Sequence, residues 1–398
     1  MKEITKKFIV SFIYINILIL LLMLSVMIPN KFVKNNILES YNSLTENSWS
    51  LLTFRSDNNA DAVALNIMLH DSENKLDGVF KAKHYGIDTQ QYLSQLKSHI
   101  DNKNNNEHEY IQYWHGYRIL WKPLLVLFNI DTIRIIMGII MSLILLYMEY
   151  MFIKNKDIYL AITWFICSIL FIVPSGCLSL EYIPLILISL IGCIITYKYN
   201  DINSSIFIIL GISTAFFDFL TAETLSFTLP FFILLYKRQS KFLDLIIDGI
   251  YWCIGYLSTF LYKYILLSVI YKHNYFKDII DIYSSHMGDF NISNKTIVFE
   301  CNLSNIPGVS LIDNYGIVII SIVILLVLAF LIRDYKISNS QYFQACILLL
   351  IPYVRYLVLL KHSITLSYFT FRAQMIALLV TLYLFRNNLI IINLRRKK

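Results

Sequence analysis

Long apolar runs, separated by short charged connections, constrain this chain more than any other feature. A helix needs about 20 apolar residues to cross the hydrocarbon core of a bilayer. Runs of that kind recur along most of the 398 residues, and 57% of the residues are hydrophobic while only 15% are charged. We therefore expect an all-α integral membrane protein, a single polytopic membrane domain over residues 1–398. The sequence predicts ten transmembrane helices, at 8–28, 134–153, 158–175, 180–197, 205–220, 222–236, 243–270, 314–333, 342–360 and 366–385.

Lys and Arg are distributed unevenly over the short connections between these runs. One set of connections carries MKEITKK, 154–157, Lys198, 237–241, 333–336, Arg386 and RRKK, whereas the other set holds only Lys361. Positive charge marks the cytoplasmic side, so both termini are predicted to be cytoplasmic in a multi-pass protein of the cell membrane. Two large connections, 29–118 and 271–313, then become extracytoplasmic loops. The run 8–28 is too long for a signal peptide and is interpreted as a retained first span.

The first loop contains its own helical patterns. ADAVALNIML places its apolar residues on one face of a helix, for which Ser56 is the expected N-cap and Asp57 the alternative cap. The stretch 119–128 is too short to span a bilayer. With Trp121 and Lys122 it suits an amphipathic helix that lies at the membrane interface.

Ionisable and aromatic residues gather on the predicted outer side. Such groups at membrane depth usually line a cavity or pair with one another. The candidate catalytic residues are Asp57 and Asp61, both expected in an exposed part of the first loop. The candidate substrate-binding residues are His115, Tyr113, Tyr117, Glu109, Asp218 and His362. The candidate phosphate-binding residues are Lys263, Arg355 and Arg372.

Structural roles are the alternative for most of these residues. The tyrosines of YWHGY also suit an interfacial aromatic belt, and Lys263 can extend its stem toward the interface. Arg355 and Asp218 can form one buried ion pair. What favours a functional site is that carboxylates, histidines and deep cations share one side under a topology assigned from other residues.

Transfer of a sugar from a polyprenyl phosphate to a hydroxyl requires this set of groups. A carboxylate removes the hydroxyl proton, and cations hold the departing phosphate. Asp57 or Asp61 suits the base, and Lys263, Arg355 and Arg372 suit the phosphate. The sequence has no glycine-rich phosphate loop and no DxD motif, which excludes the usual signatures of nucleotide-sugar enzymes.

The order of these segments resembles a known superfamily. DNNADAVALNIML, YWHGYRILWKPLL, FFDFLTAETLSFTLP, IGYLSTFLYKYIL and HSITLSYFTFR follow one another as in the C-type (GT-C) superfamily of integral-membrane glycosyltransferases. They are similar, more closely, to membrane proteins of Gram-positive bacteria linked to cell-surface polysaccharide. The resemblance implies a polyprenyl-phosphate-linked sugar donor and an acidic residue of the first loop as base, here Asp57 or Asp61. Many members are metal-independent, so no cofactor is expected, with a divalent metal as the alternative. Glu109 and His115 match only imperfectly the acidic pair, or the pair of a histidine and an acid, that often ends the loop in this superfamily.

The expected partners are a polyprenyl-phosphate-linked sugar, an envelope glycan or glycolipid acceptor and the lipid bilayer, with no nucleic acid. Two other functions stay open. A polysaccharide polymerase or ligase would need a second cationic site, for which 271–313 offers Lys272, Lys277 and Lys295. A lipid-linked glycan flippase or exporter would spread its charged residues through the membrane. A disulfide between Cys177 and Cys301 is a further open alternative.

Overall fold

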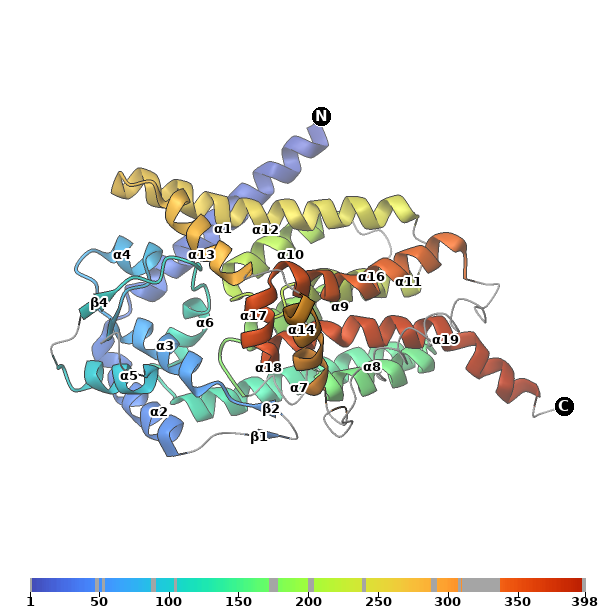
Figure 1. Cartoon of the computed structure of the whole chain (residues 1–398), viewed down its shortest axis with the longest axis horizontal. Helices are drawn as coiled ribbons and strands as arrows, with labels where there is room; N and C mark the ends of the chain where they lie inside the picture. The colour runs from blue at the N-terminus through green and yellow to red at the C-terminus, as the bar shows by residue number, and fades with distance from the viewer. Residues whose placement is uncertain are drawn as a thin grey trace.

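Apolar helices run alongside one another through the body of the computed structural model, and shorter elements cover one end of them (Figure 1). The structure describes residues 2–46, 50–51, 54–86, 91–103, 106–171, 178–199, 204–237, 241–287, 292–306, 309 and 337–395. The predicted all-α class is confirmed, because the described strands amount to two small antiparallel pairs. The predicted span 314–333 and Cys177 lie outside the described residues.

The elements that follow the first helix up to residue 129 are called the loop segment here. Its helices are η1 (Asn30–Phe32), α2 (Lys34–Glu46), α3 (Asn58–Leu69), α4 (Lys75–Phe80), α5 (Tyr92–Ile100) and α6 (Arg118–Leu124). Its strands are β1 (Ser50–Leu51), β2 (Phe54–Arg55), β3 (His84–Gly86) and β4 (Asn106–His108), paired β1 with β2 and β3 with β4.

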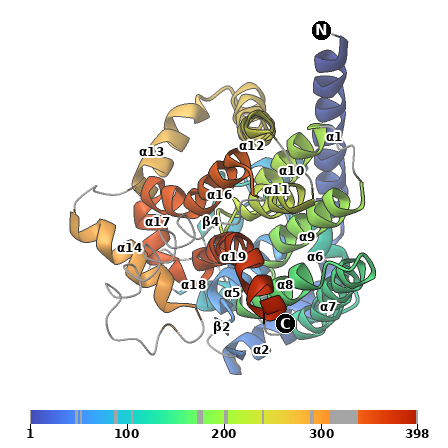
Figure 2. The same cartoon turned by 90° about the vertical axis from the view of Figure 1, so that its right-hand side faces the viewer.

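The remaining helices form the bundle and its edge. They are α1 (Lys2–Val26), α7 (Ile130–Lys154), α8 (Ile158–Phe171), α9 (Ile183–Lys198), α10 (Ser205–Phe217), α11 (Leu225–Lys237), α12 (Phe242–Tyr271), α13 (Tyr275–Met287), α14 (Ile292–Ser304), α16 (Asn339–Val358), α17 (Leu360–Thr365), α18 (Ser367–Thr370), η3 (Phe371–Gln374) and α19 (Met375–Arg395). Seen along the bundle, α19 lies near its middle, α7 and α8 on one side and α13 and α14 on the other (Figure 2).

Five helical stretches are long and apolar enough to cross a membrane. They are Thr5–Val26, Ile130–Lys154, Phe242–Tyr271, Asn339–Val358 and Ser367–Phe385. Four shorter apolar helices, α8 to α11, match predicted runs as well. The long helices expose Ile, Leu and Phe side chains along their outward faces, as a helix in contact with lipid does. The chain is therefore a helical membrane protein.

The loop segment is a packed structure rather than an extended loop. Helices α3 and α5 pack on each other and on β3. The Asn66 amide on α3 binds the backbone of Tyr85 on β3, donating to its carbonyl at 2.8 Å and accepting from its N–H at 3.3 Å. This fixes the strand against the helix, because a side-chain amide can satisfy both groups of one residue.

The predicted interface helix 119–128 is present as α6, but its expected position is wrong. Trp121 and Lys122 are both buried inside the protein. The Trp121 indole donates to the Leu180 carbonyl at 3.1 Å, and the Lys122 ammonium donates to Asn30 Oδ1 at 3.2 Å. The helix therefore ties the loop segment to the bundle.

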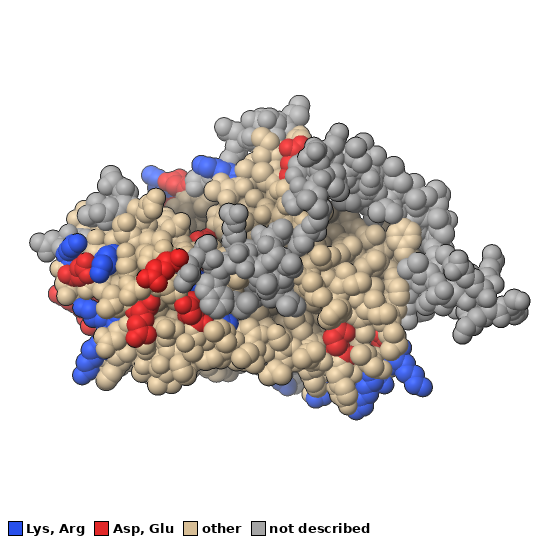
Figure 3. All heavy atoms as spheres, turned by 90° about the horizontal axis from the view of Figure 1, so that it is seen from below, with Lys and Arg blue, Asp and Glu red and all other residues tan. Residues whose placement is uncertain are grey.

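Charged side chains gather at the ends of the molecule. On the face drawn in Figure 3, acidic and basic side chains cover the end that holds the loop segment, and further basic side chains lie at the other end. Most of the surface between them carries no charge. This distribution is the one expected of a protein whose middle lies in hydrocarbon.

Candidate functional site

A cavity of about 610 Å³ lies where the loop segment meets the bundle. Its wall comes from α3, from the stretch 110–117, from the turn before α9 and from α17 and α18. Aromatic rings make up much of it, and these are Tyr92, Tyr110, Tyr113, Tyr117, Phe219, Tyr368 and Phe369. Another cavity, of about 590 Å³, is lined almost entirely by apolar residues of α11, α12 and α16 and contains no ionisable group apart from Cys253. Of these two cavities, the one at the loop segment carries the carboxyl and imidazole groups that chemistry requires.

Asp57 stands at the start of α3 and faces this cavity. One carboxylate oxygen caps the helix by accepting from the backbone N–H groups of Asn59 and Ala60, at 3.1 and 2.9 Å. The other oxygen accepts from the Tyr368 hydroxyl of α18 at 2.5 Å. The expected N-cap Ser56 is wrong, because Asp57 holds that position. The predicted helix itself is confirmed, and Val63 and Ile67 on its apolar face line the cavity.

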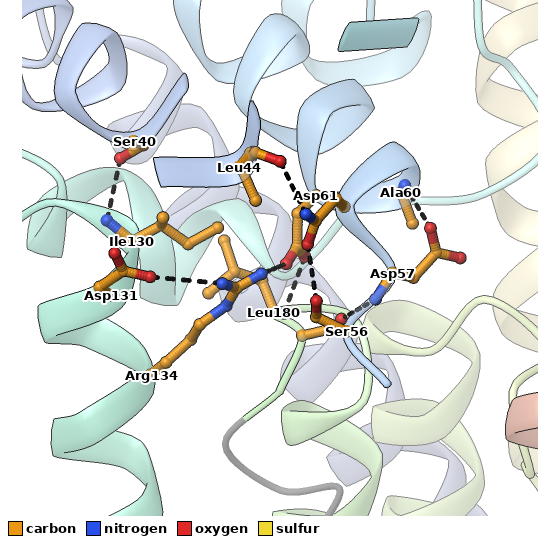
Figure 4. Close-up of polar contacts among 12 residues, drawn as sticks. Ser40, Leu44, Ser56, Asp57, Ala60, Asp61, Ile130, Asp131, Arg134 and Leu180 are labelled. Atoms are coloured by element: carbon orange, nitrogen blue, oxygen red, sulfur yellow. Dashed lines mark hydrogen bonds and ion pairs between the residues drawn. The ribbon is translucent and has the colours of Figure 1, made fainter. Parts of the chain in front are cut away.

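Asp61 has a different environment, and the expectation that it lies in an exposed loop is wrong. Its side chain is 0% exposed and forms an ion pair with Arg134 of α7 at 2.6 Å. Figure 4 shows the Arg134 guanidinium between Asp61 and Asp131, which belongs to the same helix as Arg134. Burial raises the pKa of Asp61 to about 6, and Arg134 limits the rise. Asp61 does not line the cavity.

Residues at the start of α3 also form hydrogen bonds with the segment that precedes α9. Asp61 Oδ1 accepts from the Leu180 N–H at 2.9 Å, and the Asp57 N–H donates to Ser179 Oγ at 2.7 Å. Both contacts fall next to Glu181, whose side chain lines the cavity. The two anchors therefore set the position of Glu181 relative to Asp57.

Glu181 is the main site residue that sequence reasoning missed. Its Oε1 is buried and has no hydrogen-bond partner among the described residues. Burial and the negative charges of Asp57 and Asp61 raise the pKa of Glu181 well above its ordinary value. The predicted span 180–197 included Glu181 as a membrane residue, whereas α9 begins only at Ile183. The sequence did offer one signal, a single glutamate near the start of this apolar run, three residues before Pro184.

The YWHGY stretch brings several rings to the cavity. His115 has a left-handed backbone, with φ 55°, and its Nε2 donates to the Tyr110 carbonyl at 2.9 Å. Its Nδ1 is buried without a partner in the described structure. Burial and the positive charges of Lys263 and Arg118 hold the pKa of His115 well below its usual range, so the ring is neutral. Glycine is required at Gly116, since an added Cβ would lie 2.5 Å from the Phe216 carbonyl oxygen.

Two further histidines face each other across another part of the wall. His286 of α13 and His362 of α17 have ring centroids 5.4 Å apart. The Gln112 amide nitrogen lies 2.6 Å from His286 Nε2 and donates to the Tyr113 hydroxyl at 2.9 Å. His362 Nδ1 is buried, again with no partner within the described ranges. His84 of β3 also lines the cavity with its Nδ1 unpartnered.

The three predicted phosphate-binding cations lie outside the described cavity wall. The Lys263 ammonium donates to the Tyr113 carbonyl. Arg355 binds both carboxylate oxygens of Glu223, at 3.0 and 3.2 Å, so the expected pair with Asp218 is wrong. Arg372 stacks over the Tyr182 ring at 4.2 Å. Its Nε is buried and unpartnered in the part of the chain that the structure describes.

Two predicted substrate-binding acids also lie away from the cavity wall. Asp218 accepts from the Thr221 N–H at 3.1 Å and from its hydroxyl at 2.5 Å. Glu109 is partly exposed and pairs with Lys81 at 2.7 Å. The cavity thus brings together only part of the predicted set, namely Asp57, Tyr113, His115, Tyr117 and His362.

The described residues contain no group of three His, Cys, Asp or Glu side chains placed to hold a metal ion. No protein-family model matches the chain, and neither a curated protein nor a solved structure is significantly similar to it. The functional assignment therefore depends on the chemistry of the cavity.

Proposed function

We propose that this protein is a membrane glycosyltransferase that moves a sugar from a polyprenyl-phosphate donor to an acceptor of the cell envelope. The observation that carries the proposal is a set of buried polar atoms, on the aromatic wall of one cavity, that have no partner among the described residues. These atoms are Glu181 Oε1, His84 Nδ1, His115 Nδ1, His362 Nδ1 and Tyr117 Oη. A buried polar atom without a hydrogen bond costs about 1–3 kcal/mol, so the set favours a ligand that supplies many hydrogen bonds.

A sugar fits this wall on two counts. Its hydroxyl groups both donate and accept, which suits neutral imidazoles, a phenol and a carboxyl at once. Its apolar C–H faces suit the aromatic rings that surround those atoms. The position at the end of the apolar bundle suits a donor whose polyprenyl chain stays in the bilayer while its sugar enters the cavity.

Asp57 is the base in this proposal. The acceptor hydroxyl attacks the anomeric carbon of the donor sugar, and the bond from that carbon to the phosphate oxygen breaks. The hydroxyl proton passes to the Asp57 carboxylate, and the electron pair leaves with the polyprenyl phosphate. The Tyr368 hydroxyl holds the carboxylate toward the cavity. Asp61, already paired with Arg134, acts as a structural residue.

Protonated Glu181 and Arg372 suit the leaving phosphate. A buried carboxyl that keeps its proton donates a hydrogen bond, as a developing oxyanion requires. Lys263 and Arg355 are held by other groups, so Arg372 with its unpartnered Nε is the cation we assign to this role. Its Nη1 lies 3.5 Å from the carbonyl of Tyr368, a residue of the cavity wall.

The proposal includes the membrane topology. Ten spans, with both termini in the cytoplasm, place the loop segment and the cavity on the extracytoplasmic side of the cell membrane. The asymmetry of Lys and Arg over the short connections supports this orientation. The acceptor, an envelope glycan or glycolipid, is then met outside the cell.

Asp57→Asn tests the base in a deletion strain complemented with wild-type or variant protein. Asparagine caps a helix about as well as aspartate, so the variant separates proton transfer from capping. We expect transfer to fall by about 10²–10⁴-fold while protein levels stay normal. Asp71→Asn is the matched control, because Asp71 is an exposed partner of Lys75 outside the cavity.

Envelope glycan composition reports the outcome. Loss of one sugar, restored by wild type and Asp71→Asn but not by Asp57→Asn, supports the transferase. Unchanged sugars on a shorter polymer would instead indicate a polymerase. Lipid-linked glycan that accumulates in the cytoplasm, with Asp57→Asn fully active, would indicate a flippase.

A further inference from the structure

We infer that the sugar bound in the cavity is uncharged or carries an amine, and that acidic sugars are excluded. The inference rests on the proposed function and names the class of its donor. It follows from the described cavity wall, which holds carboxyl groups but no Lys or Arg side chain.

The described wall contains two carboxyl groups and no Lys or Arg side chain. The carboxyl groups are those of Asp57 and Glu181, which come from α3 and from the turn before α9. An anionic sugar would bring its own carboxylate or phosphate into the same 610 Å³. Glu181 keeps its proton in the proposed function, so the Asp57 carboxylate is the charge that such a sugar meets. A like charge beside Asp57, with no cation on the described wall to offset it, weakens the binding of that sugar.

Apart from Arg372, which the proposed function assigns to the donor phosphate, the nearby cations Arg118 and Lys263 are committed to protein groups. Arg118 donates to the Val79 and His115 carbonyls, at 3.1 and 3.2 Å. The Lys263 ammonium donates to the Tyr113 carbonyl from inside the bundle. These side chains fix the backbone behind the wall, and turning one of them toward a ligand would leave a buried carbonyl without its donor.

The histidines supply hydrogen bonds without supplying charge. Four of them line the cavity, His84, His115, His286 and His362. Burial lowers the pKa of His84 to about 4 and that of His362 to about 2, so both are neutral at physiological pH. Their unpartnered Nδ1 atoms can bind sugar hydroxyls, but they cannot neutralise a carboxylate.

An amine has the opposite effect from an acid. A protonated amino group near Asp57 gains an opposite charge, and it donates hydrogen bonds to carboxylate oxygens. A neutral hexose needs only the hydrogen bonds of the wall. The cavity therefore accepts both classes and disfavours a hexuronic acid.

The experiment compares three classes of donor with the full-length protein in lipid nanodiscs. The donors are polyprenyl phosphates that carry neutral hexoses, hexosamines with a free amine, or hexuronic acids. With a cell-envelope extract present as the acceptor, release of polyprenyl phosphate measures transfer, and the shift in the thermal unfolding midpoint measures binding. We expect release and stabilisation with the first two classes, and at least about tenfold weaker binding of the third.

A gain-of-function variant makes the test sharper. Asn59 is exposed, lines the cavity and follows the base by two residues, and its side chain takes no part in the proposed chemistry. Asn59→Lys adds one cation to the wall, and we expect it to admit the hexuronic acid donors. Ser94→Lys adds the same charge to the exposed face of α5, away from the cavity, and should leave the discrimination unchanged.

The two failures are distinct. Use of a hexuronic acid donor by wild type as fast as a hexose donor would overturn the charge argument and keep the transferase. Absence of both release and stabilisation with every donor class would overturn the transferase itself. Discrimination against acids that Asn59→Lys does not relax would show that the wall charge is not its cause.

Discussion

Asp57 and Asp61 lie one helical turn apart and serve different ends. One oxygen of the Asp57 carboxylate caps α3, and the other accepts from Tyr368 at the cavity wall. Both oxygens of Asp61 are occupied, one by Arg134 and the other by the Leu180 N–H. Identical side chains four residues apart thus have different partners, because one faces a cavity and the other faces a helix of the bundle.

Asp61→Asn is expected to destabilise the fold by about 3 kcal/mol, because it removes the buried carboxylate that pairs with the buried Arg134 charge. The asparagine oxygen can still accept from Leu180, but its amide nitrogen then faces the guanidinium. The free energy of unfolding in mixed micelles measures the effect. Asp71→Asn, which breaks an exposed pair, should change it by about 0.5 kcal/mol or less. An Asp61→Asn protein as stable as this control, but inactive, would mean that Asp61 is the base.

At the scale of elements, the crossing of α10 and α12 holds the bundle close beneath the cavity, and the two helices run side by side in Figure 1. The backbones approach closely at Gly255, where an added Cβ would lie 2.2 Å from the Ile208 carbonyl oxygen. Small residues allow such approaches between membrane helices, where packing rather than water drives association. From the same helix, Thr259 accepts from the Trp114 indole at 2.9 Å through its carbonyl. The helix crossing therefore also positions the YWHGY stretch.

Gly255→Ala should lower the free energy of unfolding by about 1–3 kcal/mol, because the added methyl group forces the two helices apart. Gly249→Ala is a matched control on the same helix. Its added Cβ would meet the Phe227 ring at an ordinary 3.4 Å, so the higher helix propensity of alanine should leave it neutral or slightly stabilising. Equal unfolding free energies for the two variants would contradict the close crossing.

At the scale of the whole molecule, the predicted orientation puts the loop segment outside the cell and the turn that joins α7 and α8 on the cytoplasmic side. Ser94→Cys on α5 should react with a membrane-impermeant maleimide in intact cells, because Ser94 is exposed on the segment proposed to lie outside. Lys154→Cys at the end of α7 should react only after lysis. Wild type, with its own cysteines, gives the background. Labelling of Lys154→Cys in intact cells would contradict the predicted orientation and indicate the opposite one.

Much of this architecture follows from local pattern, and much of the site does not. The length of the apolar runs predicted the described bundle helices, and the period of ADAVALNIML predicted α3. The partners of a charged residue depend instead on which distant segment packs beside it. Arg134 lies 73 residues from Asp61, and Tyr368 lies 311 residues from Asp57, so no local spacing indicated either contact. Glu181 was missed for the same reason, since its position at the cavity wall is set by contacts of the neighbouring Leu180 with the distant helix α3.

The bond between Tyr368 and Asp57 has a consequence for how the protein is made. Asp57 is translated 311 residues before Tyr368, so this bond forms only after the elements α3 to α17 have been made. A chain interrupted before α18 carries the carboxylate but lacks the hydroxyl and ring that complete the cavity. A product interrupted at that point therefore has an incomplete cavity wall, and its Asp57 carboxylate lacks the bond to Tyr368.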